Sequence, residues 1–596
     1  MTRERLWPVI LGGWGIAAVV LVALSFGAIA HLWFPDPDDA MRLVQARDLL
    51  AGQSWWDVSQ HRLWDGHFAM HWSRLVDLPL VLVMGVLDPI VGPETSTRIA
   101  VTAVPLVTLL AVMALGAELT RRLCGFERAK LAVLLAPLSV PLLYQLRPLR
   151  VDHHGWQIVF ALLAVVALAG KPDRRSGALM GGALAVLLTI SLEGLPVTAA
   201  ILGVAMLAWA FDPSRRGQAM AAVWTLTGTV VLLHVATRGP AIFSPACDAV
   251  APVWIAALAV AAIGVTVPML TPRLPLVARL GLLGVAGIAA LATLALLDPN
   301  CLGGPFAGLD SFVRRFWYEN VSEGMPVWTQ VPSWAVMTIG FPVTGLIGGT
   351  LAWRASAGED RARWTMLLAL AAATFALSLL VIRTGSTANA LALPGGAWAL
   401  HAMLTRARAI RPLLPRTAAT AGALLAATPG LAAGALLGSP ESAASSSATS
   451  PQTAMTRQPC DHGHEISDLA ALPPSKLFAP VDLSPQLLAA THHSAIAAGY
   501  HRNLAALHRA MATYMADPET AHRWVRESGA AYVVGCPGTN ETELYKHFAP
   551  NGLWARLERG ESIAWLRPVA IPHSPVLAWQ VVTDAPAPEA GPPPAR

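Results

Sequence analysis

The sequence predicts a polytopic α-helical membrane protein with a small α/β domain outside the membrane, and three observations predict it. Of 596 residues, 54% are hydrophobic and only 13% are charged, with a mean hydropathy of +0.51, whereas a soluble domain averages roughly 25% charged residues. Apolar runs of near bilayer length recur through residues 1–437. Mixed composition returns only in residues 460–571. The sequence shows no basic patch with interleaved aromatic residues, so nucleic-acid binding has no support.

Thirteen apolar runs approach the roughly 17 to 20 residues that a bilayer span requires. The first run follows the charged start Met1–Arg5 without a small-residue cleavage site, so we expect a retained helix rather than a signal peptide. The run 77–93 is interrupted by Asp77 and Asp88 and is placed on the outer membrane surface. The expected spans are 8–33, 98–119, 129–147, 155–170, 176–191, 193–211, 219–237, 251–270, 276–297, 333–353, 362–381, 387–404 and 415–437.

The distribution of Lys and Arg predicts the orientation of these spans. With the N-terminus in the cytoplasm, each inner loop carries basic residues, as at Arg121 and Arg122. The outer side then holds a first outer loop at 34–97, a mobile outer loop at 298–332 and everything after 438. This sidedness fits a bacterial inner membrane, and an endoplasmic reticulum membrane has the same sidedness.

The region after the last span divides by composition. Residues 438–459 are rich in Ser, Ala and Thr and are predicted to be a flexible linker. Residues 460–571 contain a helical pattern near 485–528 and the strand-like segment Ala531–Val534, which predicts a small outer α/β domain. The Pro- and Ala-rich residues 572–596 are predicted to be a disordered tail.

All cysteines except Cys124 fall on the predicted outer side. An oxidising compartment would permit two disulfides, Cys460–Cys536 and Cys247–Cys301. Free thiols are the alternative, because spacing alone does not establish that the side chains meet.

The first candidate site is an acidic stretch in the first outer loop. Asp36, Asp38 and Asp39 follow Phe34 within five residues. Carboxylates this close repel one another, which is unfavourable for packing and useful around a divalent cation. A helix N-cap explains an aspartate at this position equally well.

Further ionisable residues fall on the same predicted face. Asp152 and His154 would point the same way in an extended segment, and a carboxylate with an imidazole suits a divalent ion. A helix N-cap with interfacial histidines is the alternative. Glu323 in an outer loop, Arg383 at the outer end of a span and Glu193 in an outer turn complete the set. Ionisable groups gathered at one membrane boundary indicate a functional site.

Three motifs in this order resemble the catalytic subunit of oligosaccharyltransferases, within the GT-C class of membrane glycosyltransferases. Asp36–Arg42 is similar to that family's first-loop motif, an Asp-Pro with an Arg six residues after the Asp. Asp152–His154 is similar to the second motif, an acid followed two residues later by an acid or a His. Asn320–Glu323, with Pro326, resembles the fifth-outer-loop motif. The resemblance covers roughly residues 1–437.

This resemblance implies an inverting, metal-dependent transferase that uses a polyprenyl-phosphate or pyrophosphate donor. By position, Asp36, Asp152 and His154 would bind Mn²⁺ or Mg²⁺. Glu323 would contact the acceptor, and Arg383 would meet the donor phosphate.

The register of the first motif leaves the roles of its acids open. Paired acids followed by Arg42 would select Asp38 or Asp39 instead of Asp36. Asp36 and Asp39 are candidate catalytic acids beside Glu323, and Asp38 is a candidate on the acceptor side.

One departure from the family concerns the acceptor. Its C-terminal domain carries Trp-Trp-Asp-Tyr-Gly, which is absent here, and Trp55–Asp57 lies in the first outer loop instead. Asp482, His493 and His501 are candidates for an acceptor site, with a solvated helix face as the alternative. The acceptor stays open among protein, lipid and glycan.

Other functions also fit a polytopic protein with boundary acids. The nearest alternative is a transferase that moves a single sugar from a polyprenyl monophosphate to a lipid or glycan. A transporter or flippase of a lipid-linked substrate is of another class, although the sequence shows no internal repeat. A scaffold that holds a partner is the third possibility. No nucleotide-binding Gly-rich loop is present.

Overall fold

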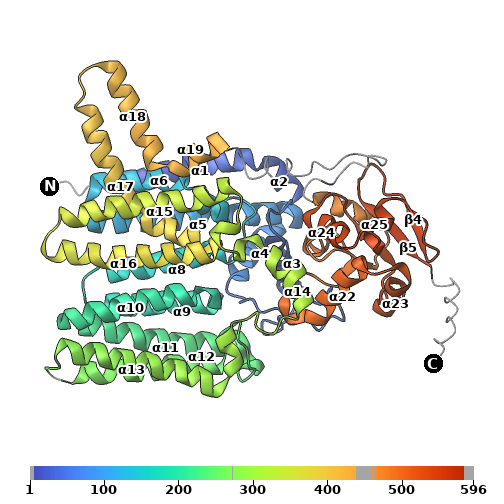
Figure 1. The fold of residues 1–596 in the computed structure, drawn as a ribbon, viewed down its shortest axis with the longest axis horizontal. Coiled ribbons are helices and arrows are strands. Elements are labelled where there is room, and N and C mark those ends of the chain that lie inside the picture. The colour runs from blue at the N-terminus through green and yellow to red at the C-terminus, as the bar shows by residue number, and fades with distance from the viewer. Residues whose placement is uncertain (1–5, 272, 438–459, 461–462, 583–596) are drawn as a thin grey trace. The chain divides into compact units, whose positions relative to one another are not determined.

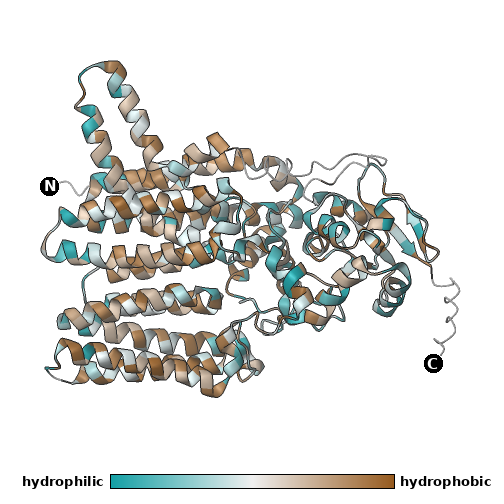
Figure 2. Cartoon of the chain, in the orientation of Figure 1, coloured by the Kyte–Doolittle hydropathy of each residue, from teal (hydrophilic) through white to brown (hydrophobic). Residues whose placement is uncertain are grey.

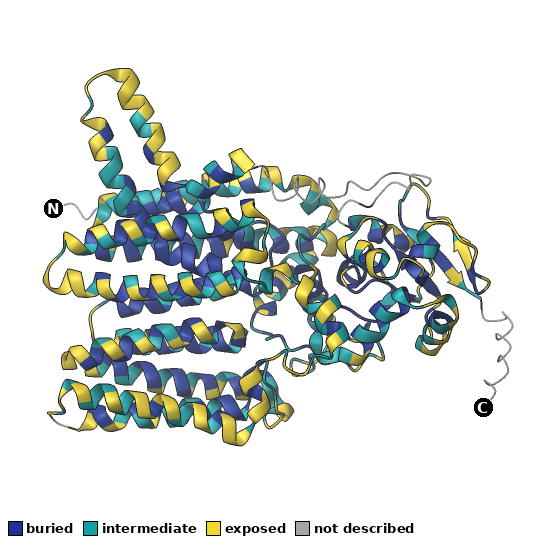
Figure 3. Ribbon diagram, viewed as in Figure 1, coloured by how far each residue is buried: buried dark blue, intermediate teal, exposed yellow. Residues whose placement is uncertain are grey.

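The computed structural model describes residues 6–271, 273–437, 460 and 463–582. The chain folds as two compact units, which we describe separately. The helical unit comprises the described residues of Met1–Ile29, Trp72–Ala307 and Val321–Thr449, and the second unit comprises those of Ala30–His71, Gly308–Asn320 and Ser450–Arg596. Buried residues gather in the interior of each unit (Figure 3).

Long helices make up the helical unit (Figure 1). Short 3₁₀ turns join several of them, of which η2 (Leu192–Gly194), η7 (Ser322–Gly324) and η9 (Ile382–Thr384) carry functional candidates. The helices are α1 (Trp7–Leu24), α4 (Asp77–Val91), α5 (Pro93–Cys124), α6 (Phe126–Leu135), α7 (Val140–Leu146), α8 (His154–Leu168), α9 (Arg174–Ile190), α10 (Leu195–Phe211), α11 (Arg216–Arg238), α12 (Pro252–Leu270), α13 (Leu276–Leu297), α15 (Pro332–Arg354), α16 (Gly358–Leu380), α17 (Gly385–Arg408), α18 (Leu413–Ala427) and α19 (Pro429–Leu437), and α2 (Phe26–His31) lies at the unit boundary.

Among the described residues, eight helical segments are long and apolar enough to cross a membrane (Figure 2). The bent pair Phe126–Leu138 and Val140–Leu146, with an angle of 69°, would make a ninth. The chain is therefore a multi-pass membrane protein. The eight segments are Trp7–Leu24, Pro93–Cys124, Leu192–Phe211, Pro213–Ala241, Pro252–Leu270, Leu276–Leu297, Pro332–Arg354 and Gly358–Leu380.

The other expected spans form shorter or more polar helices, so the count of thirteen stays a prediction. α8 has 15 residues and α9 has 17. α17 carries the buried Asn389, which donates to the carbonyl of Thr338 at 3.0 Å and accepts from the Ser139 hydroxyl at 2.8 Å. Such interhelical hydrogen bonds make a polar helix tolerable in a bilayer. The expected span 415–437 is divided at Thr428 into α18 and α19.

The second unit is built on a five-stranded sheet of strand order β2-β1-β3-β5-β4. β1 is parallel to β2 and β3, whereas β5 is antiparallel to β3 and β4. The strands are β1 (Lys476–Phe478), β2 (Ser494–Ala495), β3 (Tyr532–Gly535), β4 (Leu566–Val569) and β5 (Leu577–Val581). The helices of this unit include α3 (Pro37–Leu50), α14 (Ser311–Phe316), α21 (Ser484–Ala490), α22 (Leu504–Met515), α23 (Pro518–Ser528), α24 (Asn540–Phe548) and α25 (Leu553–Glu558).

Strand β5 corrects the predicted tail. Residues 572–596 were expected to be disordered, yet β5 pairs with both β3 and β4. Its Ala578 and Trp579 are buried in the unit, because a strand between two neighbours has both edges hydrogen-bonded. The described part of the sheet therefore extends beyond residue 571. Residues 583–596 and the predicted linker 438–459 lie outside the described residues.

Residues of the first outer loop belong to the second unit. Arg62 donates to the carbonyls of Leu488 at 2.6 Å and Thr491 at 2.9 Å. Arg47 of α3 donates to the carbonyl of Ala489 at 2.7 Å. The acidic stretch is thus carried by the same unit as the C-terminal sheet.

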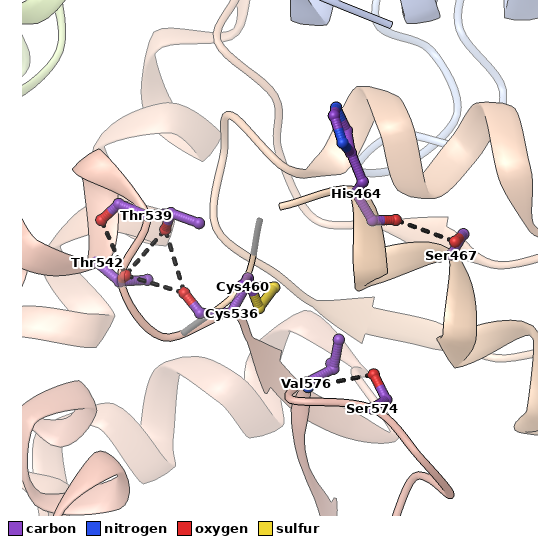
Figure 4. Close-up of a disulfide and its surroundings, with 8 residues drawn as sticks. All are labelled: Cys460, His464, Ser467, Cys536, Thr539, Thr542, Ser574 and Val576. Carbon is purple, nitrogen blue, oxygen red and sulfur yellow. Dashed lines mark hydrogen bonds between the residues drawn. A yellow bond between two sulfur atoms is a disulfide. The ribbon is translucent and has the colours of Figure 1, made fainter. Parts of the chain in front are cut away.

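Both disulfides that an oxidising compartment would permit are present. Cys460–Cys536 lies in the second unit, with Thr539 and Thr542 donating to the carbonyl of Cys536 (Figure 4). Cys247–Cys301 lies in the helical unit, and Cys124 is a free thiol.

Candidate functional site

The chain enters α8 through a tight turn that sets the first part of the candidate site. The backbone N–H of Leu149 donates to the carbonyl of Val101 at 2.8 Å, and Leu149 has a φ of +71°. His153 is the N-cap residue of α8 with a helical backbone, and its side chain makes no capping bond. The extended segment expected for Asp152 and His154 is not formed: Asp152 lies in a bend, and His154 is the first residue of α8. The N-cap residue is His153 rather than Asp152.

The turn brings three buried side chains together. His153 Nδ1 lies 2.6 Å from Asp152 Oδ1, and His154 Nε2 lies 3.5 Å from Asp152 Oδ2. All three are at most 6% exposed. Buried ionisable groups are stable only when paired, and here the carboxylate of Asp152 serves both rings.

Two acids from other segments extend the group. Glu193 of η2 places Oε2 3.4 Å from His153 Nε2. Glu323 of η7 places Oε2 3.9 Å from His154 Nε2. Both histidine rings therefore lie between two carboxylates each.

Arg383 of η9 joins these two acids. Its Nη1 lies 2.8 Å from Glu193 Oε1 and 3.4 Å from Glu323 Oε1. The backbone N–H of Ile382 donates to the carbonyl of Met325 at 3.1 Å, which fixes the loop of Glu323 beside η9. A Cβ on Gly324 would lie 3.2 Å from Arg383 Nη2, so glycine leaves room for the guanidinium.

The structure thus gathers residues from four segments into what we call the boundary cluster: Asp152, His153, His154, Glu193, Glu323 and Arg383. The sequence predicted every member except His153, whose neighbours it assigned as ligands. Ligand atoms of Asp152, His153 and His154 all lie within 4.8 Å of one another. A carboxylate and two imidazoles suit a divalent cation, and the guanidinium of Arg383 suits a phosphate.

The acidic stretch of the first outer loop lies in the second unit. Asp36 is the N-cap of α3, and its Oδ1 accepts from the backbone N–H of Asp38 at 3.0 Å. Asp39 is fully buried, whereas Asp38 is half-buried. The capping role that composition left open is therefore present for Asp36, and the metal-binding role of the stretch stays a prediction.

The candidates on the acceptor side lie in different surroundings. His493 is fully buried, with Nδ1 accepting from the Ser475 N–H at 3.2 Å and Nε2 donating to the Leu469 carbonyl at 2.8 Å, so it holds two loops together. The His501 ring lies 4.8 Å from that of His71. Asp482, which precedes both histidines in the chain, is exposed, and its role on the acceptor side stays a prediction.

The sequence did not predict Glu541, a buried acid that contacts the backbone at Asp482. Glu541 at the start of α24 accepts from the backbone N–H groups of Val481 at 2.8 Å and Asp482 at 2.9 Å, and from the Tyr545 hydroxyl. Burial, reinforced by the negative charge of Asp482, raises the pKa of Glu541 to about 8. No local pattern marks it, because its partners lie 59 and 60 residues away.

Comparison with solved structures places the fold. The archaeal oligosaccharyltransferase AglB from Archaeoglobus fulgidus, in complex with an inhibitory peptide and a dolichol-phosphate, superposes with a TM-score of 0.63. The two sequences are 14% identical, and the match covers 91% of this chain and 71% of that one. The chain shares the fold of the archaeal oligosaccharyltransferase. The fold expected from the three motifs is therefore confirmed.

Other structures of the Archaeoglobus fulgidus enzyme agree. Its complex with Zn and sulfate has a TM-score of 0.56 at 13% identity, covering 96% of this chain and 73% of that one. The form tethered to an acceptor peptide with an NVT sequon has a TM-score of 0.55 at 15% identity, covering 97% and 74%. No protein-family model and no curated protein sequence matches this chain.

Proposed function

We propose that the chain is a membrane glycosyltransferase of the GT-C class. It moves a sugar or oligosaccharide from a polyprenyl-phosphate or pyrophosphate donor to an acceptor on the outer side of the membrane. The observation that carries the proposal is the boundary cluster, which sets cation ligands beside a phosphate-binding guanidinium on a fold shared with an oligosaccharyltransferase.

The donor set of the cluster fits a divalent cation, Mn²⁺ or Mg²⁺. Asp152, His153 and His154 offer one carboxylate and two imidazoles within binding reach of one ion. By the motif resemblance, Asp36 is a further ligand. The solved complex of the archaeal enzyme with Zn and sulfate supports a divalent cation on this fold. When bound, such a cation would stabilise the negative charge that develops on the phosphate as its bond to the sugar breaks.

Arg383 holds the donor phosphate. Cleavage of the bond between the sugar and the phosphate oxygen leaves negative charge on the phosphate, and a fixed guanidinium stabilises that charge most in the transition state. The contact with Glu193 at 2.8 Å orients Arg383 before the donor arrives. The dolichol-phosphate bound to the archaeal enzyme supports a lipid-linked donor.

Glu323 orients the acceptor. Its carboxylate lies 3.9 Å from His154 Nε2 and 3.4 Å from Arg383 Nη1. A carboxylate there accepts a hydrogen bond from a hydroxyl or amide nucleophile and holds it for attack, and Asp36 or Asp39 is the alternative residue for this role. A single displacement inverts the anomeric carbon.

The proposal includes a topology. The thirteen spans place the N-terminus in the cytoplasm and the second unit outside, as the Arg and Lys distribution predicts. The Cys460–Cys536 disulfide supports an oxidising compartment for that unit. A bacterial inner membrane with the second unit in the periplasm fits both.

A second candidate function differs in the size of the transferred group and in the acceptor. The chain lacks Trp-Trp-Asp-Tyr-Gly, the family's acceptor motif. This observation favours transfer of one sugar from a polyprenyl monophosphate to a lipid or glycan over transfer to a peptide.

Donor cleavage by purified protein tests the proposal. Wild type and Glu323→Gln are incubated with a mixed pool of polyprenyl-linked sugars and an acceptor extract, and released lipid phosphate is measured. Loss of a group that acts in the transition state costs roughly 10² to 10³ in rate. Glu319→Gln is the matched control, because Glu319 is an exposed acid four residues earlier in the chain.

The two variants must differ for the proposal to stand. We expect Glu319→Gln to keep the wild-type rate and Glu323→Gln to lose at least a hundredfold. Equal rates in both variants would remove Glu323 from the mechanism, and retention at the anomeric carbon would exclude the single displacement.

A further inference from the structure

The helical unit contains an apolar cavity whose lining includes no residue of the boundary cluster. Its volume is about 450 Å³, and side chains of α10, α11, α12 and α13 line it. This volume falls within the roughly 300 to 1,000 Å³ of small-molecule pockets. The only polar side chain in its lining, Thr227, donates its hydroxyl to the carbonyl of Val223 and so presents no donor to an occupant.

The cavity opens at the exposed surface of these helices rather than toward the interior of the helical unit. Leu207, Gly284 and Gly287 in its lining are exposed. A Cβ built on Gly203, Gly284 or Gly287 would meet no atom within 4 Å. Glycine at these positions leaves the cavity empty of side chains, and a chain-like ligand can enter from the bilayer.

The cavity lies toward the C-terminal end of α10 and the N-terminal end of α13. Glu193 precedes the start of α10, whereas the α10 residues that line the cavity begin at Leu202, about 13 Å further along at a rise of 1.5 Å per residue. On α13 the lining runs from Leu280 to Gly287, about 10 Å. This length fits within the roughly 15 Å that one leaflet contributes to the hydrocarbon core.

A cation stands at that end of the cavity. Arg279 precedes Leu280 and lies one helical turn before Leu283, both of which line the cavity. Among the described residues, its Nε and Nη1 are buried and find no acceptor. Arg279 as a whole is half-buried, but buried N–H groups without an acceptor are unfavourable, so an anion at this place would stabilise them.

Other basic residues mark the same end. Arg216, at the start of α11, donates to the carbonyl of Met269 near the end of α12 at 3.4 Å. Arg215 lies beside it and pairs with Asp212 at 3.4 Å. The end of the cavity therefore has more positive than negative side chains, which favours an anionic headgroup.

We infer that this cavity binds one acyl chain of an anionic phospholipid, with Arg279 holding the lipid phosphate. The lining of the cavity includes no residue of the boundary cluster, and only the exclusion of a polyprenyl occupant rests on the proposed function. A polyprenyl donor is a poor fit, because its phosphate is needed at Arg383, beside Glu193 at the opposite end of α10.

Native mass spectrometry of the full-length protein tests the inference. Delipidated protein is mixed with equal amounts of phosphatidylglycerol and phosphatidylcholine that carry the same acyl chains, and retained lipids are counted. We expect wild type to keep one phosphatidylglycerol at roughly fivefold preference over phosphatidylcholine, because both lipids carry the phosphate but the choline cation cancels its negative charge. Undecaprenyl phosphate added in equal amount should not displace it.

Substitutions at Gly287 and at Arg279 test the contribution of the cavity and that of the positive charge separately. Gly287→Leu fills the cavity and should remove the retained lipid. Gly281→Leu is the matched control, because Gly281 is also exposed on α13, has open space at its Cβ and does not line the cavity. Arg279→Gln should keep a lipid but lose the headgroup preference, and Arg279→Lys should retain most of it.

Thermal unfolding provides a second measurement, because a ligand that binds only the folded state raises the unfolding temperature. Phosphatidylglycerol should raise it in wild type and in Gly281→Leu but not in Gly287→Leu. Equal lipid retention by Gly287→Leu and Gly281→Leu would overturn the site. Equal binding of both phospholipids by wild type, or displacement by undecaprenyl phosphate, would overturn the assigned occupant.

Discussion

Arg383 contacts two acids of the boundary cluster that come from separate turns, Glu193 and Glu323. Its Nη1 contacts both Glu193 and Glu323, and each acid in turn faces a histidine of the α8 turn. A guanidinium held between two carboxylates is already oriented, so a phosphate can replace one contact without ordering the side chain anew.

The shape of the charged side chain at position 383 should matter as well as its charge. Arg383→Gln should lower the rate of donor cleavage by about 10² to 10³. Arg383→Lys should recover only part of that loss, because an ammonium cannot make the forked contact. Steady-state rates of lipid-phosphate release measure both. Arg363→Gln is the control, since Arg363 pairs with the exposed Glu359 and Asp360 of its own helix, α16. Full activity in Arg383→Gln would contradict the assignment.

Glu541 gives the second unit a pH dependence with a defined sign. Burial and the charge of Asp482 raise its pKa to about 8, whereas an unfolded chain titrates near 4.5. Between these values the folded unit holds a proton that the unfolded chain has released, so stability falls as the pH rises. Glu541→Gln removes this titration. The unfolding temperature of wild type relative to Glu541→Gln should therefore be lower at pH 8 than at about pH 5. A difference that stays constant across this range would contradict the raised pKa.

Individual site residues were predictable only where the signal is local. Motif spacing and loop sidedness pointed to Asp152, His154, Glu193, Glu323 and Arg383. The alternation rule assumed an extended segment and therefore passed over His153, which the turn at the start of α8 brings within 2.6 Å of Asp152. The backbone conformation at one residue decides which histidine side chains face Asp152, and amino-acid composition does not reveal that conformation.

At the scale of elements, short 3₁₀ turns position the cluster. η2, η7 and η9 each carry one charged residue, at the end of an apolar helix or beside it. At these places the backbone N–H and C=O groups do not face lipid, so they need not all be hydrogen-bonded within a helix. Hydropathy predicted long helices such as α12 and α13 well. It predicted α17 as an ordinary span and missed that its polar residues bond to neighbouring helices.

Close packing of α9 against α11 depends on small residues. A Cβ on Gly177 or Gly181 would collide with backbone atoms of α11, the carbonyls of Gln218 and Ala222. Two glycines four residues apart let helix backbones approach in a membrane. Gly181→Val should therefore destabilise the helical unit by about 1–3 kcal/mol or more through overpacking, seen as a lower unfolding temperature in detergent.

A neighbouring glycine provides the control for this substitution. A Cβ on Gly182 would meet no atom within 4 Å. Gly182→Val should therefore change the unfolding temperature little. Equal destabilisation by both valines would mean that helix propensity rather than interhelical packing sets the effect.

At the scale of the whole molecule, each unit assembles distant parts of the chain. The second unit joins residues of the first outer loop to the C-terminal sheet, as in the pairing of Leu63 with Ala495. Within the loop 298–332, Gly308–Asn320 belong to the second unit, and the residues before and after this segment belong to the helical unit. Sequence reasoning treated these loops as separate outer segments, because non-local pairing leaves no periodic signal in either partner.

The central claim is that the boundary cluster catalyses cation-dependent transfer from a lipid-linked sugar. The most direct measurement is lipid-phosphate release by the purified full-length protein, over a titration of Mn²⁺ or Mg²⁺ after chelation, for wild type and folded Asp152→Asn. We expect saturable, cation-dependent release in wild type and a loss of at least a hundredfold in Asp152→Asn. Release that is indifferent to chelator, or no release from any polyprenyl-linked sugar with an acceptor extract present, would contradict it.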